Sequence, residues 1–168
     1  ENQMNSVLDY IEIGIKEGAN LACGGGRATG NNLDKGYFVQ PTLFTGVTND
    51  MRIAQEEIFG PVLAVLKYDD VDHAVSMAND SIYGLSAGVW SEDLDKAKEV
   101  AVQLRSGTVW INEWHILSER APFGGYKQSG VGREFGDEGL NEYTELKTLY
   151  VDDAKTRDNK PWYDMVVA

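Results

Sequence analysis

Cysteine is almost absent from this 168-residue sequence, and its one cysteine, Cys23, cannot form an internal disulfide. No group of cysteines and histidines has the spacing of a zinc site, so we expect no metal. Basic residues are also few, because 15 Lys and Arg stand against 27 Asp and Glu, for a formal net charge of −12. A surface this acidic repels phosphate backbones and anionic lipid headgroups. We therefore expect neither nucleic acid nor a membrane as a partner.

Long hydrophobic runs are missing as well. None approaches the roughly 18–20 residues of a membrane span, and no basic segment followed by an apolar one indicates a leader. The single cysteine fits a reducing compartment, so we expect a cytoplasmic location. With 42% apolar and 25% charged residues, the chain is typical of a globular protein that can bury one core.

Apolar residues recur in patterns that predict alternating helices and strands. Spacings of three and four over residues 2–17 predict an amphipathic helix, and Gly18 follows it where a C-cap glycine belongs. Helices are also predicted to begin near Asp70 and Ser91. A continuous apolar run predicts a strand at residues 62–66, and two further strands are predicted at residues 85–90 and 108–111. This order indicates parallel βαβ units, so we predict an α/β fold with a parallel sheet covered by helices, in which residues 62–66 are buried on both faces.

The C-terminal third has a different character. Residues 112–139 lack periodicity and are rich in glycine, and a loop of this length is usually functional. Residues 143–151 alternate in a way that predicts a late strand. The tail, residues 152–168, mixes charges with aromatic and apolar side chains, and we expect it to dock on another surface.

No complete catalytic set is visible in the residues themselves, and the glycine clusters lack phosphate-loop spacing and indicate tight turns. Adjacent residues point in different directions, so Glu56 and Glu57 are interpreted as one solvated carboxylate and one cap rather than an acid–base pair. His73 is expected at the surface, whereas His115 fits a pocket lining and a packed histidine equally well. Cys23 follows an apolar run and is expected to be an inert core thiol.

Several segments, taken together, resemble the NAD(P)-dependent aldehyde dehydrogenases. One segment that carries the resemblance is AQEEIFGPV at residues 54–62. The segment GYFVQPT (36–42) precedes it, and the segments that follow it are YGLSA (83–87), GTVWIN (107–112), PFGGYKQSG (122–130), GRE (132–134) and YTELKT (143–148). Order and spacing fit as far as about residue 151. The resemblance implies the α/β catalytic-domain fold of that family, with a late strand similar to its oligomerisation segment.

The resemblance covers only the C-terminal part of such an enzyme. Residues 1–139 resemble the C-terminal portion of the catalytic domain, and residues 140–168 the oligomerisation strand and tail. In the family, the nucleophilic cysteine, the general-base glutamate and the oxyanion asparagine precede this part, and Cys23 matches a glycine-rich turn instead. A start at Glu1 inside a helix also favours a fragment. The implied parent oxidises an aldehyde to a carboxylic acid with NAD or NADP through a cysteine thioester, and we expect the isolated chain to be inactive.

The resemblance also implies roles for particular residues. Glu57 matches a glutamate that accepts hydrogen bonds from the nicotinamide ribose, and Phe59 matches an aromatic residue beside that ribose. Glu145 matches a glutamate that relays protons near the base. The residues expected to line the aldehyde tunnel are Trp114, His115, Ile116, Leu117 and Phe123. The implied partners are the aldehyde and further copies of the protein, as a dimer or tetramer.

Two other interpretations remain open at this point. The chain is alternatively a non-catalytic binding or oligomerisation module derived from this family, or Cys23 acts as a new nucleophile. The residues that distinguish NAD from NADP are not in this sequence, and the particular aldehyde is not specified by it.

Overall fold

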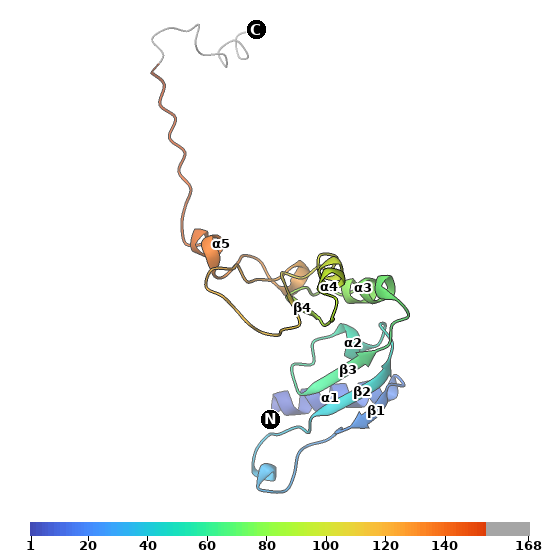
Figure 1. Ribbon diagram of the computed structural model, residues 1–168. Coiled ribbons are helices and arrows are strands. Elements are labelled where there is room, and N and C mark those ends of the chain that lie inside the picture. The colour runs from blue at the N-terminus through green and yellow to red at the C-terminus, as the bar shows by residue number, and fades with distance from the viewer. Residues whose placement is uncertain (154–168) are drawn as a thin grey trace, which may run out of the picture.

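The computed structural model describes residues 1–153, whose helices and strands alternate along most of the chain (Figure 1). The first part contains α1 (Asn2–Lys16), β1 (Asn20–Cys23), β2 (Thr42–Val47), α2 (Arg52–Gln55) and β3 (Val62–Leu66). The second part contains α3 (Val71–Asn79), β4 (Ser86–Val89), α4 (Leu94–Ala101), β5 (Thr108–Ile111) and α5 (Gly136–Asn141). Short 3-10 helices lie at Leu33–Lys35 (η1) and Lys127–Ser129 (η2).

The main core lies between α1 and the first sheet. In this sheet β2 is central, antiparallel to β1 and parallel to β3. Helix α1 ends as its sequence predicts, because Gly18 adopts a left-handed φ of 97° just after it. The buried side chains are Val7, Ile11, Ala19, Phe44, Val47, Ile53 and Ile58, which form one cluster.

The second sheet is a parallel pair, β4 and β5, joined by α4. Helix α3 begins as predicted, because the Asp70 carboxylate accepts a hydrogen bond from the backbone N–H of His73 at 2.8 Å. Helix α4 begins two residues later than predicted. Its cap is Asp93, which accepts from the backbone N–H groups of Asp95 and Lys96, while the Ser91 hydroxyl accepts from Asp93 N–H.

The α/β class is confirmed, but the strands form two sheets rather than one. Strand β3 pairs with β2 and not with β4. The prediction that residues 62–66 are buried on both faces is wrong, because α1 covers only one face of the sheet. Along β3, Leu63 is 61% and Val65 is 41% exposed, while Val62, Ala64 and Leu66 pack against the core cluster.

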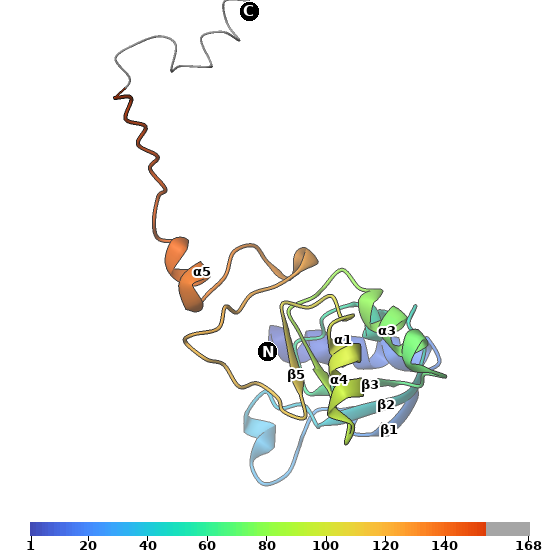
Figure 2. The same cartoon turned by 45° about the horizontal axis from the view of Figure 1, so that its top comes forward.

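The predicted late strand at residues 143–151 is not formed. Residues 144–153 have no assigned secondary structure and run away from the body of the molecule in both ribbon views (Figures 1 and 2). A strand needs hydrogen bonds to a neighbour, and no described strand lies beside this segment. Most of the tail that we expect to dock, residues 154–168, lies outside the described residues.

None of the helices in residues 1–153 is long and apolar enough to cross a membrane. These residues also contain no group of three or more His, Cys, Asp or Glu side chains arranged to hold a metal ion.

Candidate functional site

The candidate cofactor residues lie on a turn, residues 56–60, between α2 and β3. The backbone leaves α2 at Glu56 in an extended conformation, so alternate side chains point to opposite sides. Ile58 is 9% exposed and belongs to the core cluster, which anchors the turn. Glu57 is exposed, and Phe59 is 75% exposed. The sequence EEIFG thus presents Glu57 and Phe59 outward around a buried Ile58.

Phe59 has a positive φ of 55°, in the left-handed region that side chains other than glycine seldom adopt. Such a conformation costs on the order of 1–3 kcal/mol and persists only when its surroundings enforce it. The Gln3 side-chain amide of α1 donates to the Phe59 carbonyl oxygen at 3.0 Å. A helix distant in sequence therefore contacts the strained residue directly.

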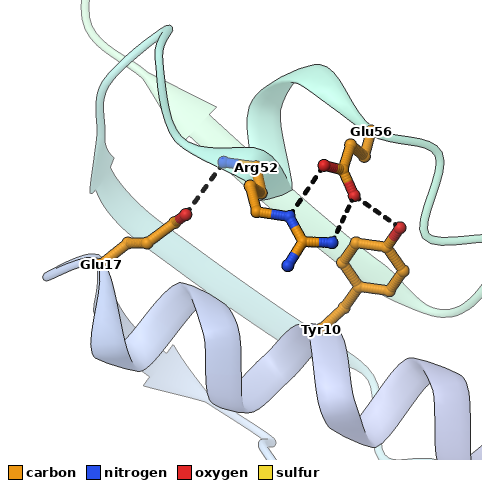
Figure 3. A network of polar contacts seen from close by, with 4 residues as sticks. All are labelled: Tyr10, Glu17, Arg52 and Glu56. Atoms are coloured by element: carbon orange, nitrogen blue, oxygen red, sulfur yellow. Dashed lines mark hydrogen bonds and ion pairs between the residues drawn. The ribbon is translucent and has the colours of Figure 1, made fainter.

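Glu56 takes part in a network that Glu57 does not share (Figure 3). Arg52 donates to both Glu56 carboxylate oxygens at 2.8 Å, and the Tyr10 hydroxyl donates to one of them at 2.8 Å. The Glu17 carboxylate accepts a hydrogen bond from Arg52 N–H at 2.9 Å. The two adjacent carboxylates therefore have different environments, as predicted: Glu57 is solvated, and Glu56 is held at the C-cap of α2.

These contacts also change the pKa values of Glu56 and Tyr10. Hydrogen bonds from Arg52, and then from Tyr10, lower the pKa of Glu56 to about 2. The Glu56 carboxylate in turn raises the pKa of the Tyr10 hydroxyl, because it accepts the phenolic proton's hydrogen bond. Glu56 is consequently an anion whose carboxylate oxygens already accept hydrogen bonds from Arg52 and Tyr10. Of the two adjacent carboxylates, Glu57 is therefore the one available to accept hydrogen bonds from a ligand.

Glu57 borders an open cleft of about 580 Å³ between α2 and the second sheet. The other side chains with polar groups that line it are Glu56, Gln55, Asn79, Ser81, Tyr83, Ser86, Ser106, Gln128 and Ser129. Hydroxyl and amide groups of this kind suit a polar ligand, and a solvated carboxylate at the rim accepts hydrogen bonds from ligand hydroxyls. This cleft contains none of the residues predicted to contact the aldehyde.

Those residues lie on the loop after β5, where aromatic rings gather. The ring of Trp114 lies 5.0 Å from that of Trp110 in an edge-on arrangement and 6.5 Å from that of Trp90. The His115 ring lies 6.2 Å from Trp110 and 6.1 Å from Trp114. The Trp110 indole N–H donates to the Ile116 carbonyl oxygen at 2.8 Å and holds the loop to β5. His115 is therefore an exposed member of an aromatic cluster.

The remaining candidates are placed separately. Phe123 is half-buried and pairs with Glu134 through backbone hydrogen bonds of 2.7 and 2.8 Å. Ile116 and Leu117 are exposed on the same loop as Trp114. Glu145 is exposed in the extended segment beyond α5. The structure thus brings together Glu57 with Phe59, and Trp114 with His115, but does not enclose all the candidates in one cavity.

Cys23 is not the core thiol that its sequence context predicted. It is exposed on β1, because the apolar run before it lies at the edge of the sheet. It borders a shallow hollow with residues of β2 and β3 whose lining contains no acid or base: Pro41, Thr42, Leu43, Gly60, Pro61, Val62 and Leu63. A nucleophilic cysteine needs an adjacent base or cation, and this hollow provides neither.

Sequence reasoning missed the residues that support the candidate site. The four-residue spacing of Arg52 and Glu56 was a usable signal for an ion pair on α2. Nothing local indicated that Tyr10 or Gln3 contacts the turn, since they lie 46 and 56 residues from Glu56 and Phe59 respectively. Lys127 was likewise missed, and its ammonium donates to the carbonyl oxygens of Asn79 and Ser81.

Comparison with known proteins places these features in a family. The chain is 54% identical over 151 residues to aldehyde dehydrogenase 1A1 of Oryctolagus cuniculus, a match that covers 90% of this chain and 30% of that protein. It is 51% identical over 153 residues to the betaine aldehyde dehydrogenase of Brucella anthropi, covering 91% of this chain and 31% of that one. The chain therefore spans about three-tenths of the length of these relatives.

Solved structures agree with the sequence comparison. The NAD+ complex of the Mycobacterium tuberculosis aldehyde dehydrogenase superposes with a TM-score of 0.86 and 49% identity, over 92% of this chain and 32% of that one. The NAD+ complex of the Bacillus cereus enzyme gives a TM-score of 0.86 and 51% identity, over 92% and 30%. The family model described as "Aldehyde dehydrogenase family" matches residues 1–149. The chain belongs to the aldehyde dehydrogenase family.

Proposed function

We propose that this chain is the C-terminal part of the catalytic unit of an aldehyde dehydrogenase that oxidises an aldehyde to a carboxylic acid with NAD or NADP. The observation that carries this proposal is the turn that presents Glu57 at the rim of a polar cleft and, two residues later, the exposed ring of Phe59. Membership of the family and the NAD+ complexes of two relatives support it. Residues 1–139 would form the catalytic portion and residues 140–168 the oligomerisation strand and tail.

The geometry fits one part of the cofactor. The Glu57 carboxylate accepts no hydrogen bond within the described residues, so it is available to two ribose hydroxyls at once. The exposed Phe59 ring would limit the movement of the group held there. When bound, the nicotinamide supplies the hydride acceptor. This chain would contribute orientation of that acceptor, while the nucleophilic cysteine and the general base come from outside it.

The aromatic loop would contact the aldehyde. Trp114 and Phe123 offer apolar walls, and His115, Ile116 and Leu117 would adjust their shape and polarity. Glu145, in the segment beyond α5, would relay protons toward the base. The exposed segment 143–151 would add as a strand to a second subunit, because an extended segment with free backbone groups pairs readily with a sheet edge.

The first test asks whether the isolated chain has aldehyde dehydrogenase activity of its own. The 168-residue chain is mixed with NAD+ and a panel of aliphatic and aromatic aldehydes, and NADH is followed by absorbance. We expect no turnover. Turnover that disappears in Cys23→Ser would identify Cys23 as a nucleophile and overturn the assignment.

The second test asks whether the chain can serve in an active enzyme. Residues 1–149 replace the segment to which they align in the Oryctolagus cuniculus relative, and hydride transfer is measured in single turnovers. We expect activity in this chimera and slower hydride transfer in its Glu57→Gln variant. An unchanged rate in Glu57→Gln would remove the cofactor role. An inactive but folded chimera would favour a non-catalytic module.

A further inference from the structure

We propose that one face of α1 positions the turn that carries Glu57 and Phe59, and so sets the orientation of the bound cofactor. The residues of this face are Gln3, Val7 and Tyr10, which we call the α1 clamp. Their spacing of four and three residues places them on one side of the helix. The inference rests on the cofactor role proposed above for Glu57 and Phe59.

The clamp contacts both ends of the turn by different chemistry. At its start, the Tyr10 hydroxyl donates to Glu56 at 2.8 Å, beside the ion pair of Glu56 with Arg52 (Figure 3). At its end, Val7 is 2% exposed and packs against the backbone of Gly60. A Cβ atom built on Gly60 would lie 2.5 Å from a Val7 methyl carbon, so a glycine is required for this approach.

The centre of the turn is held by Gln3. Its side-chain amide nitrogen lies 3.0 Å from the carbonyl oxygen of Phe59 and 3.5 Å from that of Ile58. These carbonyls belong to the two peptide bonds on either side of the left-handed Phe59. Because a strained residue keeps its conformation only when its neighbours enforce it, Gln3 is placed where it can hold Phe59 outward.

The arrangement goes beyond what stability of the core requires. Ile58 and Val7 of the core cluster already anchor the turn by apolar packing, whereas Gln3 is exposed and contacts the turn through its polar side-chain amide. The polar contacts of the clamp fix the direction of two side chains that point into solvent. A cofactor-binding carboxylate acts only if it stays within hydrogen-bond reach of the ligand, so orientation is the property that the clamp controls.

The first experiment measures order in the 168-residue chain itself. Backbone 15N order parameters are recorded for residues 57–60 in the wild type and in a Gln3→Ala/Tyr10→Phe double variant. We expect them to fall from about 0.85 to below about 0.6, while those of β2 and β3 stay unchanged. Glu12→Gln is the matched control, since Glu12 lies on the same helix and, among the described residues, pairs with the exposed Lys16 and does not contact the turn. Unchanged order at residues 57–60 would overturn the clamp.

The second experiment uses the chimera described above. We expect Gln3→Ala and Tyr10→Phe each to slow single-turnover hydride transfer by about fivefold or more, with the NAD+ dissociation constant changed less than twofold. Combined with Glu57→Gln, neither should slow the reaction further, because all three substitutions would remove the same alignment. A purely structural role would instead lower thermal stability and add to the effect of Glu57→Gln.

The outcomes separate the two proposals. If Glu57→Gln leaves hydride transfer unchanged, the cofactor role is lost and the proposed orienting role is lost with it, whatever the order parameters are. If Glu57→Gln slows hydride transfer while Gln3→Ala and Tyr10→Phe do not, the cofactor role stands and the clamp is overturned. If the NMR spectrum of the double variant loses its dispersion, that variant has not folded. The single variant Tyr10→Phe, which removes one hydroxyl, then decides the first experiment.

Discussion

The substitution Gly125→Ala tests how the long glycine-rich loop is attached to the second sheet. Gly125 is buried, and a Cβ atom built on it would lie 2.6 Å from Ser129 Cβ, 2.7 Å from the Ser129 carbonyl carbon and 2.9 Å from Gly130 N. None of these atoms can rotate away, because two are backbone atoms and the position of the Ser129 Cβ is set by its backbone. Restoring an ordinary contact of 3.4 Å or more therefore requires the segment around η2 to move by about 0.8 Å.

That movement would strain the hydrogen bonds that hold η2 in place. The backbone N–H of Tyr126 donates to the Gly84 carbonyl oxygen at 2.8 Å, and Gly84 N–H donates to the Ser129 hydroxyl at 2.8 Å. Overpacking costs about 1–3 kcal/mol, and each lost hydrogen bond adds about 1 kcal/mol. We expect Gly125→Ala to lower the free energy of unfolding by about 2–4 kcal/mol.

The assay is urea unfolding followed by tryptophan fluorescence and circular dichroism. The matched control is Gly26→Ala, because a Cβ atom there would meet only the end of the Gln40 side chain, at 3.6 Å. We expect the control to stay within about 0.5 kcal/mol of the wild type. A value for Gly125→Ala as small as that of the control would show that the loop yields without cost, and would refute the packing described here.

Three further predictions follow from single contacts. Because the pKa of Glu56 is lowered from 4.5 to about 2, its contribution to stability is present above pH 4.5 and is lost as the pH falls toward 2; urea midpoints measured between these values should depend less on pH in Glu56→Gln. Phe44→Ala should cost about 3–5 kcal/mol in the same unfolding assay, since its side chain is fully buried. Asp70→Ala should cost about 1 kcal/mol by removing the cap of α3, seen as a lower thermal midpoint.

The sequence was sufficient where structure depends on neighbouring residues. The apolar spacing of Met4, Val7 and Ile11 correctly predicted α1, and Gly18 correctly marked its end, because a helix face and a left-handed cap are local properties. Asp70 was identified as a cap for the same reason. The cap of α4 was misplaced at Ser91, since Ser91 and Asp93 are both good capping residues and only the backbone geometry distinguishes them.

The errors occurred where structure depends on distant residues. The run at residues 62–66 contains only apolar residues, so the sequence could not indicate that Leu63 and Val65 face away from α1. Residues 143–151 have the composition of a strand, but strand formation requires a partner that the described chain does not provide. The burial of Cys23 was wrongly predicted for the same reason, because an apolar run at the edge of a sheet has the same sequence pattern as one at its centre.

The solvent exposure of the candidate residues indicates which catalytic tasks this chain would perform and which the rest of the enzyme would perform. An active site that transfers hydride must exclude water, yet Phe59 is 75% and Ile116 is 61% exposed in the described residues. On the proposed assignment, the side chains for the cofactor and those for the aldehyde would each be covered by a facing wall from the rest of the enzyme. On the proposed division, this chain sets orientation and substrate choice while bond formation belongs to residues outside it. Substitution at Glu57 or His115 should then alter hydride transfer or the order of preferred aldehydes, and leave the reactivity of the nucleophilic cysteine toward a thiol reagent unchanged.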